Sequence, residues 1–252
     1  MRPIHVRIII RNFLNDMVRK TPERRRYSSW NAAVRAAKTN YEYDRLTRFR
    51  IERSKGILGE EERYVNPPVE ISEILTSGEG DFVDFGGSAG EASAVLKRRF
   101  PMWSFTVVET PSIAKSAASM RPEITFSETL PDSMTVFYSS GTLQYLEDPY
   151  GLWAEALRKT IGYAFLARNA FSETQSFRVQ HSMLFDNGAG PIPEGFENAV
   201  TRYPHRTISE GKLVQIAEEN GFELAQRFPD RNSGLAQGAA DMYGADLLFR
   251  RI

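Results

Sequence analysis

The sequence predicts an α/β fold built around a doubly wound, parallel sheet. Apolar runs alternate with helix-like segments from residue 81 onward, and alternation of this kind favours a parallel sheet. A glycine-rich turn at residues 84–90 joins the first apolar run to a helix-like segment. The next apolar run ends on Glu109, about 20 residues further on, where a doubly wound fold places an acid that holds a ribose diol. Two separated signals therefore indicate a nucleotide-binding edge of the sheet.

The residues before this pattern are predicted to form a helical extension. Helix-like periodicity runs from about residue 13 to residue 62, and Pro67 and Pro68 mark a boundary. We therefore expect two parts, a helical extension or cap at residues 1–66 and a sheet domain at residues 67–252.

Apolar runs and turn residues set the expected elements of the sheet domain. Strands are expected at about residues 81–85, 104–109, 124–126, 135–140 and 162–168. Helices are expected at Glu91–Phe100, at Ile113–Met120 and after Asp148, which can cap a helix whose first residue is Pro149.

The C-terminal part of the chain is less regular. Glycines and prolines cluster at residues 188–195, so residues 169–207 are expected to form a long, irregular insertion. Ser209 can cap the helix that follows the insertion. Apolar runs at 222–228 and 245–251 are expected to be the two closing strands.

The glycine turn has the features of a loop that holds a nucleotide against main-chain amides. Gly86, Gly87 and Gly90 lack a Cβ atom, so the backbone can take positive φ and a ligand can approach the N–H groups of the helix N-terminus. The NAD pattern G-x-G-x-x-G would need a glycine where Glu91 stands. The turn therefore argues against NAD, and a plain turn without a ligand is the other interpretation.

The turn from Asp84 to Gly90, acid-x-Gly-x-Ser-x-Gly, resembles the acid-x-Gly-x-Gly-x-Gly turn of class I S-adenosylmethionine-dependent methyltransferases. The segment SSGTLQYLEDP at residues 139–149 resembles the one that follows the fourth strand in that family. With VVETP at 107–111 and RVQ at 178–180, these motifs resemble a bacterial methyltransferase family that we associate with surface-polysaccharide gene clusters. The resemblance covers roughly residues 28–251.

The resemblance implies a Rossmann-like sheet of seven strands in which the last strand is antiparallel, and S-adenosylmethionine as the cofactor. It also implies methyl transfer to a hydroxyl group of a sugar or glycan-related small molecule. The cofactor-binding residues that it implies are Asp84, Gly86, Gly87, Ser88, Gly90, Glu109, Ser127, Ser139, Ser140 and Gln144. Ser88 departs from the family's middle glycine, and a left-handed serine there would cost about 1–2 kcal/mol.

A hydroxyl acceptor needs a base, and histidine suits this role near neutral pH. His181 follows the RVQ motif and His205 closes the same segment, which borders the acceptor pocket in the resembled fold. Tyr145 is a further candidate as a wall or proton relay. The other interpretation of each histidine is a surface position or a hydrogen-bonded core position.

Composition excludes several other chemistries. The chain has no cysteine, which excludes disulfides and iron–sulfur clusters, and no His or acid cluster has metal-ligand spacing, so no metal is expected. No membrane span and no secretory leader are recognised, so a cytoplasmic protein is expected. The partners expected are a small-molecule or glycan acceptor, no nucleic acid, and possibly a second copy in a homo-oligomer.

The charge is distributed unevenly. Residues 1–66 carry about twice as many basic as acidic side chains, whereas residues 67–252 carry an acidic excess. This pattern favours an extension that docks on the sheet domain, and an anion-binding surface is the alternative. As a cap, the extension would bring Tyr27, Trp30 or Tyr41 to the acceptor pocket; otherwise it packs behind the sheet or forms dimer contacts.

Two other function classes stay open. An NAD-linked sugar oxidoreductase or epimerase is one, although the sequence has neither G-x-G-x-x-G nor a Tyr-x-x-x-Lys pair. A non-catalytic nucleotide-binding module is the other, which Ser88 and the lack of an obvious base leave open.

Overall fold

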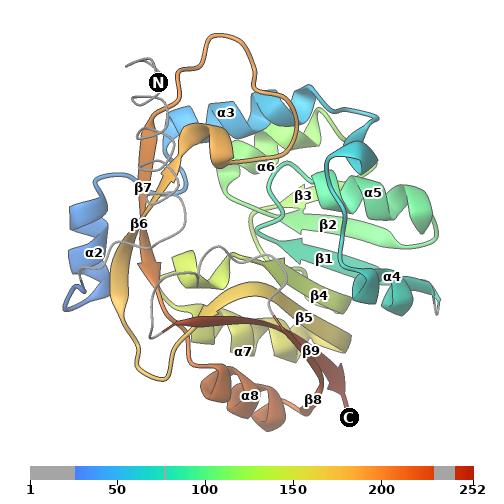
Figure 1. The fold of residues 1–252 in the computed structure, drawn as a ribbon. Coiled ribbons are helices and arrows are strands. Elements are labelled where there is room, and N and C mark those ends of the chain that lie inside the picture. The colour runs from blue at the N-terminus through green and yellow to red at the C-terminus, as the bar shows by residue number, and fades with distance from the viewer. Residues whose placement is uncertain (1–25, 77, 230–241) are drawn as a thin grey trace, which may run out of the picture.

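The computed structural model describes residues 26–76, 78–229 and 242–252, and Figure 1 shows their arrangement. Its centre is a seven-stranded sheet in the order β3-β2-β1-β4-β5-β9-β8. The strands are β1 (Asp81–Phe85), β2 (Ser104–Val108), β3 (Thr125–Ser127), β4 (Met134–Ser140), β5 (Thr160–Phe171), β8 (Phe222–Pro229) and β9 (Tyr243–Arg251). Strands β1 to β5 pair in parallel, and β9 runs antiparallel to both β5 and β8. The predicted doubly wound sheet of seven strands, with an antiparallel last strand, is confirmed.

Helices cover both faces of this sheet. They are α4 (Val69–Thr76), α5 (Glu91–Arg99), α6 (Pro111–Ala118), α7 (Pro149–Lys159) and α8 (Glu210–Glu219). Phe82 packs on the side of α4 and α5, whereas its neighbour Val83 packs on the side of α7 and α8. Because successive strand residues point to opposite faces, strands that are buried on both sides carry apolar residues at neighbouring positions.

Helix starts follow the local sequence signals. The Asp148 carboxylate accepts a hydrogen bond from the Gly151 N–H at 2.9 Å, and the Ser209 hydroxyl accepts one from Lys212 at 3.2 Å. Both predicted caps are therefore confirmed. The helix expected at Ile113–Met120 begins earlier, because Pro111 has the φ value suited to a first helical turn.

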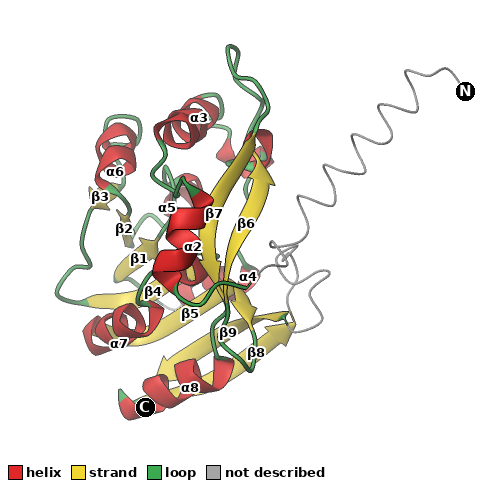
Figure 2. Ribbon diagram, turned by 90° about the vertical axis from the view of Figure 1, so that its left-hand side faces the viewer, coloured by secondary structure: helices red, strands yellow, loops and turns green. Residues whose placement is uncertain are grey.

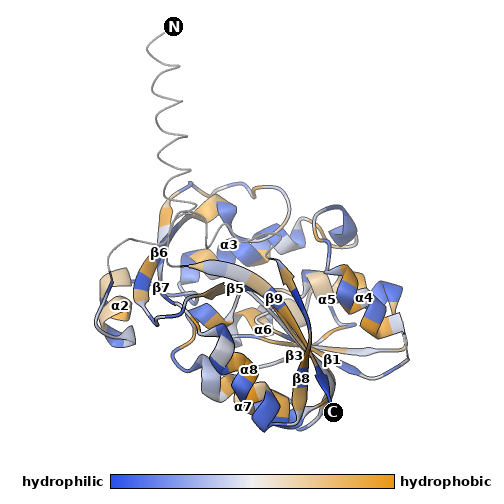
Figure 3. Ribbon diagram, turned by 60° about the horizontal axis from the view of Figure 1, so that its bottom comes forward, coloured by the Kyte–Doolittle hydropathy of each residue, from blue (hydrophilic) through white to orange (hydrophobic). Residues whose placement is uncertain are grey.

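The described part of the N-terminal extension contains two helices and a short turn of 3-10 helix. These are α2 (Trp30–Ala37), α3 (Asp44–Lys55) and η1 (Glu61–Arg63). Helix α3 packs on α6 and is mostly hydrophilic in Figure 3. The helical pattern expected before residue 26 lies outside the described residues, and the domain boundary at residue 66 stays a prediction.

The prediction of an irregular insertion at residues 169–207 is wrong in part, because regular strands occupy a large share of that segment. Strand β5 continues to Phe171, and β6 (Phe177–Met183) pairs with β7 (Val200–Arg206) as a separate antiparallel hairpin, which Figure 2 shows with α2 lying across it. The glycines and prolines that suggested irregular structure lie in the connection between the two strands. Pro204 is tolerated within β7 because each strand of a two-stranded sheet has a free edge.

Candidate cofactor and acceptor site

The glycine turn between β1 and α5 takes the left-handed geometry that its sequence suggested. Gly86 and Gly90 have φ values of 75° and 82°, and Ser88 has a φ of 58°. A Cβ atom on Gly86 would lie 2.2 Å from the Thr142 hydroxyl oxygen, so the turn and the segment after β4 approach too closely for a larger residue. The left-handed Ser88 carries the strain of about 1–2 kcal/mol that a non-glycine residue pays there.

Asp84 supports this turn from the interior of the protein. Its side chain is almost fully buried, accepts a hydrogen bond from the Ser93 hydroxyl at 3.1 Å, and leaves no room for a Cβ atom on Gly87. Burial raises the pKa of Asp84 to about 7; the Ser93 hydrogen bond lowers it, and the nearby Glu109 charge raises it further. Asp84 therefore shapes the loop from inside the protein and does not face its open side.

Glu109 lies at the end of β2, beside the glycine turn. Its Oε1 atom accepts a hydrogen bond from the Ser88 N–H at 3.1 Å, and its Oε2 atom accepts one from the Thr110 N–H at 2.9 Å. A carboxylate has about two lone-pair positions on each oxygen, so each oxygen keeps one position for a further donor. Arg50 of α3 takes the one on Oε1, with Nη2 at 3.3 Å.

Two buried hydroxyl groups flank this carboxylate without using their hydrogen-bonding capacity. Within the described residues, neither Ser88 Oγ nor Thr110 Oγ1 has a partner. Buried polar atoms are normally satisfied, so unused groups beside an anchored carboxylate suit a polar ligand with hydroxyls of its own. The surroundings of Glu109 therefore fit a ribose diol, provided that Arg50 gives up its position on Oε1.

The four other predicted cofactor residues make contacts within the protein. Ser127 Oγ accepts from the Thr129 N–H at 3.1 Å and closes the turn after β3, and Ser139 Oγ donates to the Phe85 carbonyl at 3.1 Å. The Ser140 carbonyl accepts from Thr142 at 3.4 Å, and Gln144 donates to the Arg168 carbonyl at 3.2 Å. Ser139 thus joins β4 to β1, and Gln144 joins the segment after β4 to β5. Contact of these four residues with a cofactor stays a prediction.

A cluster of aromatic rings lies between the extension, the segment after β4 and the β6–β7 hairpin. The ring of Tyr41 lies 4.6 Å from that of Tyr145 and 4.5 Å from that of Tyr203, and His205 lies 5.6 Å from Tyr145. The Tyr145 hydroxyl donates to Gln180 at 2.7 Å. We call Tyr41, Tyr145, Tyr203 and His205 the tyrosine cluster. The sequence did not predict Tyr203 as a member, because its position depends on how β6 and β7 pair.

The hairpin places the two predicted histidines on opposite faces. His205 pairs with Arg178, and Gln180 pairs with Tyr203, so these side chains share the face that contacts Tyr145. His181 pairs with Arg202 on the other face. The structure therefore brings His205 and Tyr145 together and does not bring His181 to them.

His205 is fully buried, and within the described residues neither ring nitrogen has a hydrogen-bond partner. Burial, assisted by the positive charge of Arg178, lowers the pKa of His205 to about 3, so the ring is neutral at pH 7. Burial and the neighbouring tyrosines raise the pKa of Tyr145 well above its ordinary value. Tyr145 can thus donate a hydrogen bond at neutral pH but is a poor base.

A buried arginine joins the extension to the glycine turn. Arg121 has no exposed surface; its guanidinium donates to the Ala89 carbonyl at 2.9 Å, to the Ser54 hydroxyl at 2.9 Å and to Glu61 at 3.0 Å. Ala89 belongs to the glycine turn, whereas Ser54 and Glu61 belong to α3 and η1. The partly exposed Arg98 forms an ion pair with the second oxygen of Glu61, with Nη2 at 2.9 Å from Oε2.

Arginines of α3 also reach the β6–β7 connection. Arg53 donates to the carbonyl groups of Phe185 at 2.9 Å and Asn187 at 3.1 Å, and Arg45 donates to that of Glu197 at 2.9 Å. Some of the basic side chains of the extension therefore donate hydrogen bonds to backbone carbonyl groups of the sheet domain.

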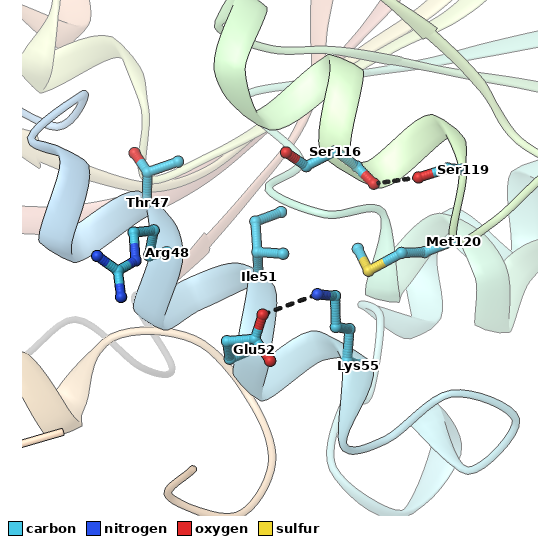
Figure 4. Close-up of a pocket in the computed structure, with 8 residues that line it drawn as sticks. All are labelled: Thr47, Arg48, Ile51, Glu52, Lys55, Ser116, Ser119 and Met120. Carbon is cyan, nitrogen blue, oxygen red and sulfur yellow. Dashed lines mark hydrogen bonds and ion pairs between the residues drawn. The ribbon is translucent and has the colours of Figure 1, made fainter. Parts of the chain in front are cut away.

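A cavity of about 340 Å³ lies between α3 and α6 (Figure 4). It is lined by Thr47, Arg48, Ile51, Glu52, Lys55, Ser116, Ser119 and Met120. Lys55 and Glu52 form an ion pair at its edge. None of the predicted site residues lines it, so the cavity is not the candidate site.

Two other features are absent from the described residues. No group of three His, Asp or Glu side chains there is arranged to hold a metal ion. No helix in residues 26–76, 78–229 and 242–252 has the length and apolarity needed to span a bilayer.

The comparison with known proteins identifies the fold. No protein-family model matches the chain, and no curated protein is similar to it in sequence. The CcbJ methyltransferase from Streptomyces caelestis superimposes with a TM-score of 0.51 at 13% identity, over 83% of this chain and 99% of that one. An S-adenosylmethionine-dependent methyltransferase from Clostridium acetobutylicum gives a TM-score of 0.49 at 9% identity, over 84% of this chain and 96% of that one. With the observed strand order, the likeness to CcbJ shows that the chain has the class I methyltransferase fold.

Proposed function

We propose that the protein is an S-adenosylmethionine-dependent methyltransferase that acts on a hydroxyl group of a sugar or glycan-related small molecule. The observation that carries this proposal is the environment of Glu109. Its carboxylate is fixed by two backbone amides at the carboxyl end of β2, where a doubly wound fold binds a ribose. The solved neighbours bear methyltransferase names, which supports the same reaction class.

In this proposal the two sides of the site have separate tasks. Glu109 accepts hydrogen bonds from the ribose hydroxyls, and the Ser88 N–H of the left-handed turn holds that carboxylate in place. When bound, S-adenosylmethionine supplies the sulfonium methyl group that the acceptor attacks in line. Tyr41 and Tyr145 exclude water from the acceptor, because alignment and desolvation are most of what the protein contributes to such a displacement.

His205 is the proposed acceptor of the hydroxyl proton. Of the two histidines on the hairpin, His205 is the one on the face that contacts Tyr145. Within the described residues, neither nitrogen of its neutral ring has a hydrogen-bond partner. Its low pKa limits proton transfer until the acceptor displaces the neighbours that bury the ring.

The extension is the proposed cap of the site. Helix α3 reaches Glu109 through Arg50, and the segment before α3 brings Tyr41 into the tyrosine cluster. Both contacts favour a cap, because an extension that packed behind the sheet would not reach these residues.

A nitrogen acceptor is the second candidate. Neither His205 nor Tyr145 has a pKa near neutrality, which favours a nucleophile that needs no strong base. A neutral amine meets that condition, and nearby guanidinium groups such as Arg50 would lower the pKa of its protonated form.

The test begins with calorimetry of cofactor binding. We expect micromolar binding of S-adenosylmethionine or S-adenosylhomocysteine and no binding of NAD. Incubation with S-adenosylmethionine and candidate sugars should then give a product heavier by about 14 Da, the mass of one CH₂. Saturable binding of NAD in place of S-adenosylhomocysteine would reject the proposal, and the site of the added methyl group distinguishes oxygen from nitrogen.

A further inference from the structure

Arg168 has an unusual backbone at the carboxyl end of β5. Its φ is 58°, in the left-handed region, and the pairing of β5 with β9 shifts register between Leu166 and Asn169. A non-glycine residue in that conformation costs about 1–2 kcal/mol. Strained residues persist only where their surroundings hold them, and they are frequent at ligand sites.

Two buried side chains hold this strained residue in place. The Arg168 N–H donates to Asp246 Oδ1 at 2.8 Å, and the Arg168 carbonyl accepts from the Gln144 amide at 3.2 Å. Gln144 is fully buried and Asp246 nearly so. The protein therefore fixes both sides of the Arg168 peptide with polar groups from β9 and from the segment after β4.

The side chain itself is exposed, and within the described residues it makes no hydrogen bond or ion pair. It leans across the end of β4, because its Cζ atom lies 3.8 Å from where a Cβ atom of Gly141 would stand. In contrast, Arg50 pairs with Glu109, and Arg206 donates to the Glu147 carbonyl. Arg168 thus extends an exposed cation from a fixed backbone where β4 and β5 end, with donors that no described residue uses.

The surroundings of Arg168 suit a ligand more than an internal partner. Ligands of doubly wound folds bind outside the carboxyl ends of the parallel strands. The positive charge of Arg168 is felt by Tyr41, Tyr138 and Tyr145, where it opposes the effect of burial on the pKa of each phenol. In addition, the Arg168 carbonyl accepts from Gln144, the residue before Tyr145, so Arg168 lies beside the segment that carries Tyr145.

We propose that Arg168 binds an anionic group of the methyl acceptor, either a carboxylate or a phosphate. That the bound anion belongs to a methyl acceptor rests on the proposed function, whereas the anion site itself does not. A guanidinium group presents a planar fork of donors that matches both kinds of oxyanion, and such paired, charge-assisted hydrogen bonds are among the strongest in proteins. The acceptor is then an acidic sugar or a phosphorylated one, such as a nucleotide-linked sugar.

The test titrates three probes into the full-length protein with and without S-adenosylhomocysteine, using NMR-detected binding. The probes are glucuronic acid for a carboxylate, UDP-glucose for a phosphate and glucose as the neutral reference. We expect one charged probe to bind and glucose to bind at least ten times more weakly. Arg168→Gln should weaken the charged probe by about tenfold or more, and Arg168→Lys should restore part of that loss.

Two further variants keep the result interpretable. Arg168→Gly suits the positive φ and removes only the side chain, so it should behave like Arg168→Gln even if glutamine strains the bulge. Arg202→Gln removes an exposed charge from the other face of the hairpin and should change nothing.

Three outcomes would overturn the inference: charged probes that bind no better than glucose, unchanged binding in both Arg168→Gln and Arg168→Gly, or a loss confined to S-adenosylhomocysteine. The last result would assign the anion to the cofactor. If S-adenosylhomocysteine fails to bind the unmodified protein, the proposed function fails, and the titrations without it still decide whether Arg168 holds an anion.

Discussion

The two sides of the candidate site are built in different ways. On the cofactor side, the glycine turn and Glu109 come from β1, β2 and the residues that directly follow each strand. On the acceptor side, Tyr41 precedes α3, Tyr145 follows β4, and Tyr203 and His205 lie on β7. The first side is a product of local turn chemistry, whereas the second exists only once a hairpin and an extension have docked.

Both sides of the site contain backbone strain and unused polar groups. Ser88 and Arg168 are left-handed residues at the ends of β1 and β5, one on each side of the site. Unpartnered hydroxyls flank Glu109, and an unpartnered imidazole lies in the tyrosine cluster. Each side therefore has a strained residue and an unpartnered polar group that packing alone does not account for.

The largest expected effect tests the acceptor side. His205→Ala should lower turnover by about 10²–10⁴, because it removes the proposed proton acceptor, while the affinity for S-adenosylhomocysteine stays close to that of the unmodified protein. His181→Ala is the matched control on the opposite face of the hairpin and should keep near-normal turnover. Full turnover in His205→Ala would exclude His205 and favour the nitrogen acceptor.

A second test breaks the link between the extension and the cofactor side. Arg121→Met should destabilise the protein by about 3–5 kcal/mol, because the buried Glu61 carboxylate would lose its fully buried partner. Urea denaturation measures the loss. Arg98→Gln, which removes the partly exposed partner of the same carboxylate, should cost less than about 1 kcal/mol. Equal effects of the two changes would contradict the importance of the buried contact.

The third test uses the raised pKa of Asp84. A carboxyl group whose pKa rises on folding stabilises the native state below its unfolded pKa and loses that contribution as pH rises through its folded value. Stability attributed to Asp84 should therefore fall between about pH 4 and pH 7. Asp84→Asn should remove this dependence, so its melting temperature relative to the unmodified protein should rise across that range. A constant difference would show that Asp84 is ionised throughout.

The fourth test measures the cofactor side directly. Glu109→Ala should weaken binding of S-adenosylhomocysteine by about 1.5–3 kcal/mol, since hydrogen bonds from the ribose to a charged acceptor are lost. Calorimetry gives the dissociation constant, and Glu123→Ala, an exposed acid near β3, is the control. Unchanged affinity in Glu109→Ala would place the ribose elsewhere.

The smallest expected effect concerns the contact between the extension and Glu109. Arg50→Gln should strengthen cofactor binding by about three- to tenfold, because the guanidinium group and the ribose compete for one position on Oε1. Arg48→Gln, on the same helix but beside the α3–α6 cavity, should leave the affinity unchanged. Weaker binding in Arg50→Gln would mean that Arg50 helps to hold the cofactor.

The sequence predicted those parts of the fold whose signals lie within a few residues. The glycine turn, the caps at Asp148 and Ser209, and the five parallel strands depend on local φ preference and apolar runs, and all of them are observed. Glu109 could be predicted as a site residue because a fixed spacing links it to the turn, and the structure places it beside that turn.

What the sequence did not predict depends on distant partners. The β6–β7 hairpin was missed because Gly188 and Pro191 dominate its connection and Pro204 interrupts a strand. Arg50 and Arg168 carry no local signal: one depends on how α3 packs, and the other on a bulge that Asp246 and Gln144 support. Which histidine faces Tyr145 follows from strand register, which single residues do not reveal.

The buried guanidinium of Arg121 also constrains how the chain can fold. Its partners lie on α3, on η1 and in the glycine turn, so a stable, dehydrated Arg121 requires all three segments at once. The extension and the turn should then open together, and their amide hydrogens should exchange with solvent as one cooperative unit. A ligand that holds the turn would slow exchange in α3 as well, although α3 need not touch that ligand.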